Sequence, residues 1–422
     1  MIDKDVLIQY LLDFQEKSLP ALIKRELQIP LKKEYIISII GPRRSGKTFY
    51  FYQLIKGLPR EKVMYIDFEH PLFEDFTSKD TITLLKLQRE AVGDPEYIFF
   101  DEVQNIPGWE KSVRYLQDEG YHVFVTGSSS KLLSKEIATS LRGRTLKYAL
   151  FPFSFREFLS AKRFKVRKHL SSRKEGEIKA LLREYLSWGG FPQVVMEEEE
   201  EIRRRILSEY LDLIIYKDLV ERYGIRNLHV LKLLVRALMR SFSKEFSVHS
   251  FYNTLKSQNI RISKGVLYEY LGYVEDSMSV FLLKKFSYSV KTSELSIPKV
   301  YPVDTGLPKL FSPSMDIGRL MENAVFVELL RREKETYYYK DQREVDFVII
   351  QRGKPTELLQ VTYALDYEDI KPRELDALNR AGKKLNVEQT TIITWDYEDR
   401  KGNIDFVPLW KWLLRDRGNE NH

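Results

Sequence analysis

The clearest chemistry in the sequence lies in one short run, Gly41-Pro-Arg-Arg-Ser-Gly-Lys-Thr48. It follows the apolar stretch 35–40, which predicts a buried strand, and it opens a predicted helix. Glycines in such a loop let backbone N–H groups face phosphate oxygens, and the helix N-terminus favours negative charge. We expect Lys47 to neutralise the phosphates of ATP and the Thr48 hydroxyl to coordinate Mg²⁺. The predicted nucleotide-binding residues are Gly41, Pro42, Arg43, Arg44, Ser45, Gly46, Lys47, Thr48 and Phe49.

Two adjacent acids form the second candidate motif. Asp101 and Glu102 directly follow the apolar residues 97–100. This pattern predicts a buried strand whose carboxyl end brings both side chains to the phosphate loop. We expect Asp101 to hold the Mg²⁺ shell and Glu102 to polarise the attacking water as a general base. An acid pair at this place favours hydrolysis of ATP to ADP and phosphate over transfer to another acceptor.

Hydroxyl and guanidinium groups near the next two strands complete the candidates. The apolar run 121–126 ends in Thr126, with Ser128 close behind, and in a parallel sheet this tip lies beside the phosphate site. One of these hydroxyls senses the γ-phosphate, or both only cap the loop. Arg142 and Arg144 precede the last strand. Either they are surface arginines, or one reaches the nucleotide of a neighbouring subunit, which requires a homo-oligomer.

These side chains can meet only if their strands end at the same edge of a sheet. The hydrophobic pattern predicts such a sheet. Apolar runs at 35–40, 62–68, 96–100, 121–126 and 145–150 alternate with predicted helices. Strands that are apolar on both faces and separated by helices predict a parallel sheet with helices on both faces. A helix is expected over 5–28 with a break near Pro20, and a helical segment over 174–223 is interrupted by residues 188–192.

Length and composition narrow the class of protein. The 422 residues are too many for one core and predict a multidomain α/β protein. The absence of Cys excludes disulfide scaffolds, thiol catalysis and Cys-ligated metals. No apolar run approaches the ~20 residues of a membrane span, and the acidic N-terminus lacks a signal-peptide pattern, so we expect a cytoplasmic protein without a membrane partner. High Lys, Glu, Arg, Ile and Tyr usage resembles that of thermophiles.

The net charge of +7 is concentrated in residues 225–292, which carry eleven basic and four acidic side chains. Their pattern predicts three short helices and a β-hairpin ending at 280–284, the arrangement of a winged helix, with 263–271 as recognition helix. We therefore expect DNA as a partner, held mainly by its phosphate backbone. The alternative is a basic lid module that packs on the ATPase domain and binds only neighbouring subunits. The nucleic-acid candidates are Lys256, Arg261, Lys264, Lys284 and Lys285.

The order of these motifs resembles the AAA+ group of P-loop ATPases. Together with Phe151-Pro-Phe-Ser-Phe-Arg-Glu-Phe158 and Trp188-Gly-Gly-Phe-Pro192, it resembles, over essentially the whole chain, an archaeal and bacterial ATPase family with a nuclease-like C-terminal domain of unknown function. The resemblance implies an AAA+-like ATPase domain with an N-terminal helix over 1–165 and a helical lid over 166–224. It further implies a winged-helix domain over 225–312 and a restriction-endonuclease-like α/β domain over 313–422.

The resemblance of the last domain is to the PD-(D/E)xK nuclease core, and the match is incomplete. Asp346 stands at the first acid, Gln360 replaces the second acid, and Thr362 stands where the lysine is expected. The helix acid would be Glu322 or Glu328, and Lys354 or Lys371 could replace the lysine. Losing one anionic ligand and the local cation weakens metal binding and water activation. A fold retained for binding or assembly is therefore favoured over active cleavage.

The sequence thus predicts a Mg²⁺-dependent ATPase that couples hydrolysis to the binding or remodelling of DNA. Two alternatives remain open: a nucleotide-switched regulatory ATPase that acts on a protein partner, and an ATP-regulated nuclease.

Overall fold

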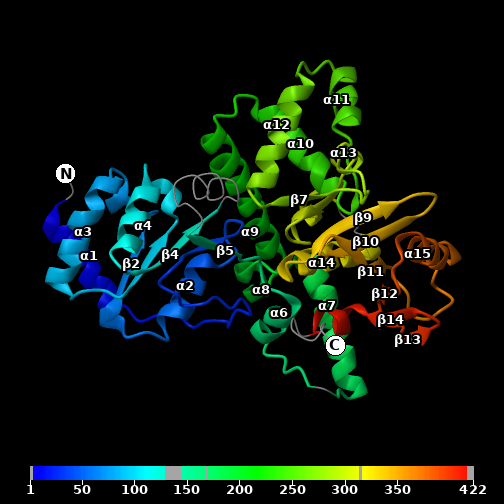
Figure 1. Ribbon diagram of the computed structural model, residues 1–422, viewed down its shortest axis with the longest axis horizontal. Coiled ribbons are helices and arrows are strands. Elements are labelled where there is room, and N and C mark those ends of the chain that lie inside the picture. The colour runs from blue at the N-terminus through cyan, green and yellow to red at the C-terminus, as the bar shows by residue number, and fades with distance from the viewer. Residues whose placement is uncertain (1–2, 129–143, 168, 313–315, 416–422) are drawn as a thin grey trace. The chain divides into compact units, whose positions relative to one another are not determined.

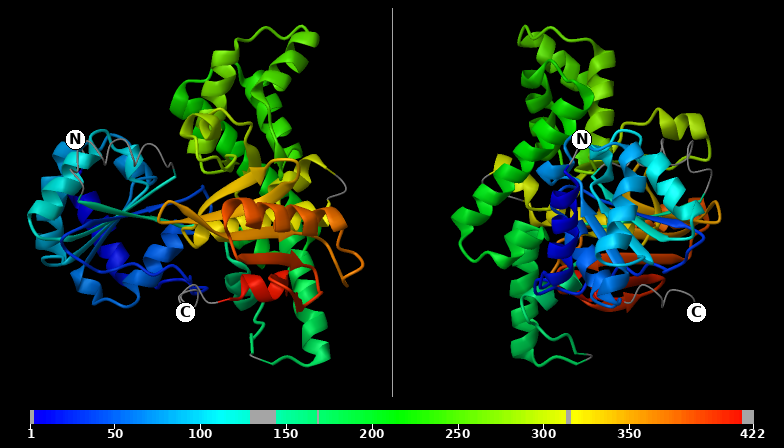
Figure 2. Two further views of the ribbon diagram at one scale, coloured as in Figure 1. Left: turned by 45° about the vertical axis from the view of Figure 1, so that its right-hand side comes forward. Right: turned by 90° about the vertical axis from the view of Figure 1, so that its left-hand side faces the viewer.

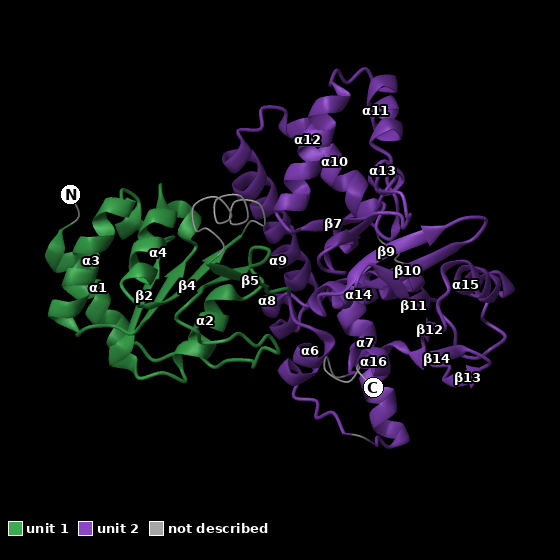
Figure 3. Cartoon of the chain, in the orientation of Figure 1, with its two compact units in different colours: residues 1–151 green, residues 152–422 purple. Residues whose placement is uncertain are grey.

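The protein is described by a computed structural model over residues 3–128, 144–167, 169–312 and 316–415. The chain forms two compact units, Met1–Phe151 and Pro152–His422 (Figure 3). Within the described residues, no helix combines the length and the apolar character that crossing a membrane requires.

The first unit is built on a parallel five-stranded sheet in the order β2-β3-β4-β1-β5 (Figure 1). The predicted parallel α/β sheet is confirmed, with each strand within about two residues of its expected bounds. Alternate residues of these strands pack into two separate apolar clusters, one on each face of the sheet, because helices cover both faces. The strands are β1 (Ile36–Ile40), β2 (Val63–Asp67), β3 (Tyr97–Asp101), β4 (His122–Gly127) and β5 (Thr145–Ala149).

The described α-helices of this unit pack on the two faces of the sheet. One face is covered by α1, α3 and α4, and the other by α2 and the end of α1. The α-helices are α1 (Lys4–Glu16), α2 (Lys47–Ile55), α3 (Thr81–Ala91) and α4 (Trp109–Asp118). Short 3₁₀ turns are η1 (Arg60–Lys62), η2 (Pro71–Phe73), η3 (Ser78–Asp80) and η4 (Val103–Asn105).

The helix expected over 5–28 is shorter than predicted. It ends at Glu16, and residues 17–28 are not helical. Pro20 has no N–H to donate and disfavours helical backbone at the residue before it. Leu19 and Leu22 nevertheless pack against the core, as part of an irregular segment.

The second unit begins with α6, which the sequence did not predict, followed by the helical segment that was expected over 174–223. This segment is interrupted where Gly189 adopts φ +78°, and a Cβ atom there would lie 1.7 Å from an oxygen of Asp304. The same carboxylate accepts the N–H of Gly190 at 2.6 Å, so the two glycines allow this turn to form. The elements are α6 (Phe155–Ala161), α7 (Ser172–Trp188), α8 (Pro192–Met196), α9 (Glu200–Leu213), a π-helical segment η5 (Ile214–Glu221) and, later, a 3₁₀ segment η6 (Leu307–Phe311).

Residues 228–302 form three longer helices, one short helix and a small antiparallel sheet in the order β6-β8-β7. The predicted hairpin is longer than expected, since its second strand is β8 and its connection over 284–298 contains a short helix. In chain order the elements are α10 (Leu228–Arg240), β6 (Lys244–Glu245), α11 (Val248–Ser257), α12 (Lys264–Asp276), β7 (Val280–Leu283), α13 (Val290–Glu294) and β8 (Lys299–Pro302).

The last part of the second unit is a six-stranded mixed sheet in the order β13-β14-β12-β11-β10-β9. Figure 2 shows α15, in orange, lying along one face, where Leu378 and Ala381 join the core. On the other face, Phe326 of α14 packs against Phe347. The elements are α14 (Ile317–Arg331), β9 (Glu335–Lys340), β10 (Glu344–Gln351), β11 (Lys354–Val361), α15 (Pro372–Leu385), β12 (Gln389–Thr394), β13 (Asp399–Lys401), β14 (Ile404–Pro408) and α16 (Leu409–Leu413).

Candidate functional site

The loop between β1 and α2 curls tightly because glycine stands at both of its ends. A Cβ atom at Gly41 would lie 2.2 Å from the carbonyl oxygen of Leu150, which leaves no room for a side chain. Gly46 adopts φ +96° and precedes the first helical residue, Lys47. The loop therefore leads directly into the N-terminus of α2, as a phosphate-binding loop requires.

Lys47 is buried and links this loop to the acid pair. Its ammonium lies 3.3 Å from the carbonyl oxygens of both Gly41 and Pro42. It also lies 3.2 Å from Oε1 of Glu102. The end of β3 and the loop after β1 thus share one cation, because parallel strands end at the same edge of the sheet.

Asp101 is held by hydroxyl groups from three elements. Thr48 at the start of α2 donates to Oδ2 at 2.6 Å, and the Tyr65 hydroxyl donates to the same oxygen at 3.1 Å. Thr126 at the end of β4 donates to the other oxygen, Oδ1. Burial raises the pKa of Asp101 to about 6, the charge of Glu102 adds to this rise, and the hydroxyl donors oppose it.

Glu102 shares this buried setting but keeps its charge more readily. Its backbone adopts φ +52°, which few residues other than glycine do, and its N–H donates to the Thr126 hydroxyl at 2.8 Å. Burial alone would raise the pKa of Glu102, but Lys47 and a 2.5 Å hydrogen bond from Gln104 lower it below its ordinary value. Two adjacent acids therefore have pKa values shifted in opposite directions.

The other predicted nucleotide-site residues surround this centre. The Pro42 carbonyl accepts the N–H of Ser45 at 3.2 Å, which closes the loop. Arg43 donates to Glu69 at 2.6 Å, Arg44 adopts φ +67°, and Phe49 is exposed.

The remaining candidates of this unit have different environments. Thr126 and Ser128 are fully buried, and the Thr126 hydroxyl is engaged by Asp101 and Glu102 rather than turned toward solvent. Arg144 lies at the beginning of β5, where its carbonyl accepts the N–H of Ile36, so it is at the opposite edge of the sheet from the phosphate loop. Its guanidinium donates to Asp118 at 2.8 Å on the surface. Arg142 lies outside the described residues.

Sequence reasoning missed Arg25, which supports the phosphate loop from inside. This buried arginine donates to the carbonyl oxygen of Ser45 at 2.9 Å and to that of Phe151 at 2.5 Å. Its backbone N–H donates to the side chain of Gln53 on α2 at 2.7 Å. Nothing in residue spacing marks it among 68 basic residues, because its contacts are made only after folding.

The basic candidates lie around α12 and the start of the 284–298 connection. Lys256, Arg261 and Lys264 are exposed, and the last of them begins α12. Lys284 is exposed and ion-paired with Glu294 at 2.6 Å, while Lys285 is half-buried.

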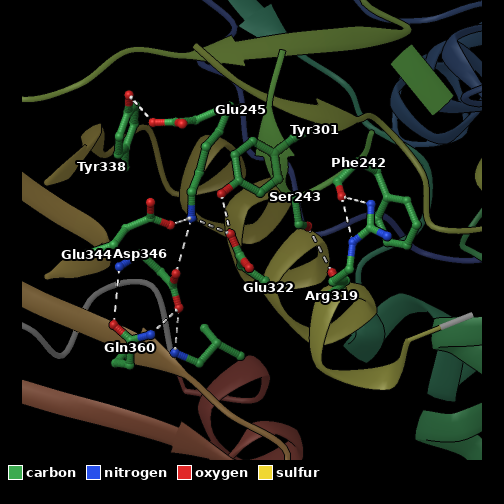
Figure 4. Close-up of polar contacts among 12 residues, drawn as sticks. Phe242, Ser243, Glu245, Tyr301, Arg319, Glu322, Tyr338, Glu344, Asp346 and Gln360 are labelled. Carbon is green, nitrogen blue, oxygen red and sulfur yellow. Dashed lines mark hydrogen bonds and ion pairs between the residues drawn. The ribbon is translucent and has the colours of Figure 1, made fainter. Parts of the chain in front are cut away.

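The nuclease-like candidates of the C-terminal sheet are only partly brought together (Figure 4). Gln360 donates to Asp346 at 2.8 Å and accepts its backbone N–H at 3.3 Å. Glu322, the other helix acid considered, faces this pair, since both Glu322 and Asp346 bind the ammonium of Lys299. Burial raises the pKa of Glu322 to about 7, and the charge of Asp346 adds to this rise.

Of the other two candidates, Glu328 is placed elsewhere, whereas Thr362 lines the same pocket as Asp346 and Gln360. Glu328 pairs with Arg331 at 2.7 Å and Arg332 at 3.0 Å, away from Asp346. The backbone N–H of Thr362 donates to Ile393 at 2.9 Å, which places it just beyond β11.

Comparisons with known proteins match three separate parts of the chain. A family model described as an AAA domain matches residues 33–159. A domain of unknown function, DUF8612, matches 179–311, and another, DUF4143, matches 317–412. A solved structure of a DNA polymerase III gamma subunit-related protein from Thermotoga maritima is 13% identical and covers 64% of this chain and 99% of that one. Its TM-score of 0.27 is too low for a shared overall architecture.

Two full-length relatives are much more similar in sequence. An uncharacterized protein of Methanocaldococcus jannaschii is 40% identical and covers 98% of this chain and 96% of its own length. An uncharacterized protein of Haemophilus influenzae is 30% identical over 90% of this chain and 95% of its own length. The chain therefore belongs to the family of these two proteins, and its first unit contains an AAA-type P-loop ATPase domain.

Proposed function

We propose that this protein is a Mg²⁺-dependent ATPase that hydrolyses ATP to ADP and phosphate. The observation that carries the proposal is the meeting of Lys47, Thr48 and the acids of β3 at one edge of the sheet. A cation, a hydroxyl, a carboxylate for the metal and a second carboxylate for water are the groups that this reaction needs.

The residues present fit a magnesium ion. Thr48 Oγ1 and Asp101 Oδ2 lie 2.6 Å apart, and hydroxyl and carboxylate oxygens are the ligands that Mg²⁺ takes. These two residues would hold the ion, which supplies neutralisation of phosphate charge when it is bound. Lys47 would exchange its carbonyl partners for phosphate oxygens, because these are stronger acceptors for an ammonium.

Glu102 is the proposed general base. A lowered pKa keeps its carboxylate ionised at neutral pH, ready to take a proton from the attacking water. Thr126 is the proposed positioning residue, since one hydroxyl fixes both the Asp101 carboxylate and the backbone of Glu102. Arg142 and Arg144 remain proposals for a residue that acts on the nucleotide of another subunit in a homo-oligomer.

We further propose that hydrolysis is coupled to DNA through residues 225–312. The order α10-β6-α11-α12-β7-β8, with the short helix α13 before β8, supports a winged helix, and residues 225–292 carry the charge surplus. Exposed Arg261 and Lys264 flank the N-terminus of α12, a place suited to phosphate contact. The domain bounds 1–165, 166–224, 225–312 and 313–422 remain our proposed division.

The DNA proposal is tested by ATP turnover with and without single-stranded, duplex and branched DNA at several salt concentrations. We expect at least one DNA structure to raise turnover and to bind less tightly as salt increases, because phosphate contacts release counterions. Binding that is absent or independent of salt contradicts the DNA role and leaves the ATPase role standing.

One observation favours a protein partner as a second candidate. The 284–298 connection exposes Tyr288, Val290 and Leu295 by 74%, 75% and 76%, and apolar side chains of this size are typical of protein-binding surfaces. A nucleotide-switched regulatory ATPase predicts slow turnover that DNA does not change.

A further inference from the structure

Lys299, the first residue of β8, is buried among carboxyl groups of α14 and β10, which are labelled in Figure 4 as Glu322, Glu344 and Asp346. The ammonium of Lys299 lies 2.8 Å from Glu344, 3.0 Å from Glu322 and 3.2 Å from Asp346. The Lys299 side chain is only 3% exposed. A buried charge is tolerated only where it is paired and hydrogen-bonded, as this one is.

The carboxyl groups come from two elements and accept further hydrogen bonds. Glu322 belongs to α14 and accepts the Tyr301 hydroxyl at 2.6 Å. Asp346 belongs to β10, and its second oxygen accepts the N–H of Val361 at 3.0 Å and the amide of Gln360 at 2.8 Å. The acids are therefore oriented toward the place where the ammonium lies.

A resident divalent metal does not fit these side chains. Gln360 turns an amide donor toward Asp346 where a second carboxylate is expected, and no set of three His, Cys, Asp or Glu among the described residues is arranged to hold a metal. The position that such an ion would take between Glu322 and Asp346 is bridged by the Lys299 ammonium.

We propose that Lys299 is the built-in cation of this cluster and excludes divalent metal from it. An ammonium and a divalent ion compete for the same carboxyl oxygens, so only one of them is held at a time. Removing the ammonium leaves Glu322, Glu344 and Asp346 without their shared cation and lets them close around a divalent cation, an arrangement that the described residues do not have in the natural chain.

Lys299 also links two sheets. It is the first residue of β8 and directly follows the 284–298 connection. Glu245 of β6 accepts hydrogen bonds from Tyr338 at 3.2 Å and Lys340 at 2.8 Å, both on β9. The cluster therefore links the small sheet, and with it the end of the connection, to the C-terminal sheet.

Mn²⁺ binding to the nucleotide-free full chain tests the proposal, measured by electron paramagnetic resonance. All chains carry Asp101→Asn, so that the phosphate site contributes no metal. We expect Lys299→Met to gain one bound Mn²⁺ per chain and to lose it again when Asp346→Asn is added. The matched control, Lys340→Met, removes an exposed lysine at the rim that contacts Glu245 and Glu344, and should gain no bound metal.

Two results overturn the proposal. The first is Mn²⁺ bound by the chain with Lys299 intact and lost with Asp346→Asn, since the ammonium then excludes nothing. The second is a Lys299→Met chain that gains no metal, whether it is folded or stays unfolded at millimolar Mn²⁺. Thermal unfolding with and without Mn²⁺ distinguishes these results from the expected one. A metal that replaces the ammonium must raise the unfolding midpoint of the Lys299→Met chain and of no other chain.

Discussion

Asp101 and Glu102 are neighbours in the chain, yet their surroundings prepare them for different tasks. Asp101 receives neutral hydroxyl donors and has a raised pKa, whereas Glu102 faces the Lys47 ammonium and has a lowered one. The left-handed backbone at Glu102 turns its side chain out of the strand alternation that would otherwise separate the two acids. Charge placement thus distinguishes the proposed metal ligand from the proposed base.

Thr126→Val tests the proposed positioning role with a side chain of nearly equal shape. The substitution removes the hydroxyl that donates to Asp101 and accepts from Glu102, a loss worth ~1–3 kcal/mol. We expect kcat for ATP to fall about 10- to 100-fold while the Kd for ATP changes little. The control is Thr145→Val on β5, whose buried hydroxyl has no partner among the described residues. Equal turnover in both variants would refute the positioning role.

Arg25→Met tests the internal support of the phosphate loop. It leaves the carbonyl oxygens of Ser45 and Phe151 without this donor in a buried place, which should cost roughly 2–4 kcal/mol of unfolding free energy. The measurement is urea unfolding, together with the Kd for ATP, which should rise. The neighbouring Lys24 is exposed, so Lys24→Met should change neither quantity. A stable Arg25→Met chain with normal affinity would show that the loop does not need this support.

At the scale of elements, the sequence predicts regular strands with a clear apolar pattern, but it does not predict irregular apolar segments or short polar strands. The five strands of the first unit were predicted because apolar side chains occupy both of their faces. The helix over 17–28 was wrongly predicted, since Leu19 and Leu22 are apolar but follow an irregular path around Pro20. The short strand β13 is Asp-Arg-Lys and carries no apolar signal at all.

In the candidate sites, contiguous motifs could be predicted from the sequence, whereas contacts between distant residues could not. The phosphate loop and acid pair were located because each motif is contiguous and strand ends meet at one edge. Lys299 could not be found, because it lies 47 positions from Asp346 and belongs to a different sheet. Glu322 and Glu328 were equally plausible as helix acids until the face of α14 was known.

The turn between α7 and α8 makes a pH-dependent prediction. Burial raises the pKa of Asp304 to about 6, against the N–H groups of Gly190 and Gly306 and the charge of Arg331, which lower it. A raised carboxyl pKa means that the folded state binds the proton more tightly than the unfolded state does. Protonation of Asp304 therefore stabilises the fold fully below about pH 4, and this stabilisation is lost as pH rises through 6. We expect the unfolding free energy of Asp304→Asn, relative to the natural chain, to increase between pH 4 and pH 6. A difference that is constant with pH would contradict the assignment.

The basic surface around α12 makes a prediction about salt. Lys264→Glu should weaken DNA binding and make the slope of log Kd against log salt shallower, because fewer counterions are released. The matched control is Lys174→Glu on α7, an exposed lysine outside the basic segment. Equal losses in both variants would indicate general charge attraction rather than a site at α12.

At the scale of the whole molecule, the two chemical features lie in different compact units. The phosphate site belongs to Met1–Phe151, and the charge surplus belongs to Pro152–His422. Any coupling between hydrolysis and a partner must therefore pass from one unit to the other. Such coupling depends on the proposed hydrolysis of ATP in the first unit.

ATP turnover by Glu102→Gln, measured beside ATP binding, tests the proposed hydrolysis most directly. The amide keeps the size of the side chain but cannot accept a proton, so kcat should fall about 10²- to 10⁴-fold while ATP still binds. Lys47→Ala provides the contrast, since it should lose binding itself. We expect the natural chain to hydrolyse ATP with Mg²⁺ and the Glu102→Gln chain to hold ATP unhydrolysed. Turnover by Glu102→Gln at the natural rate would contradict this proposal.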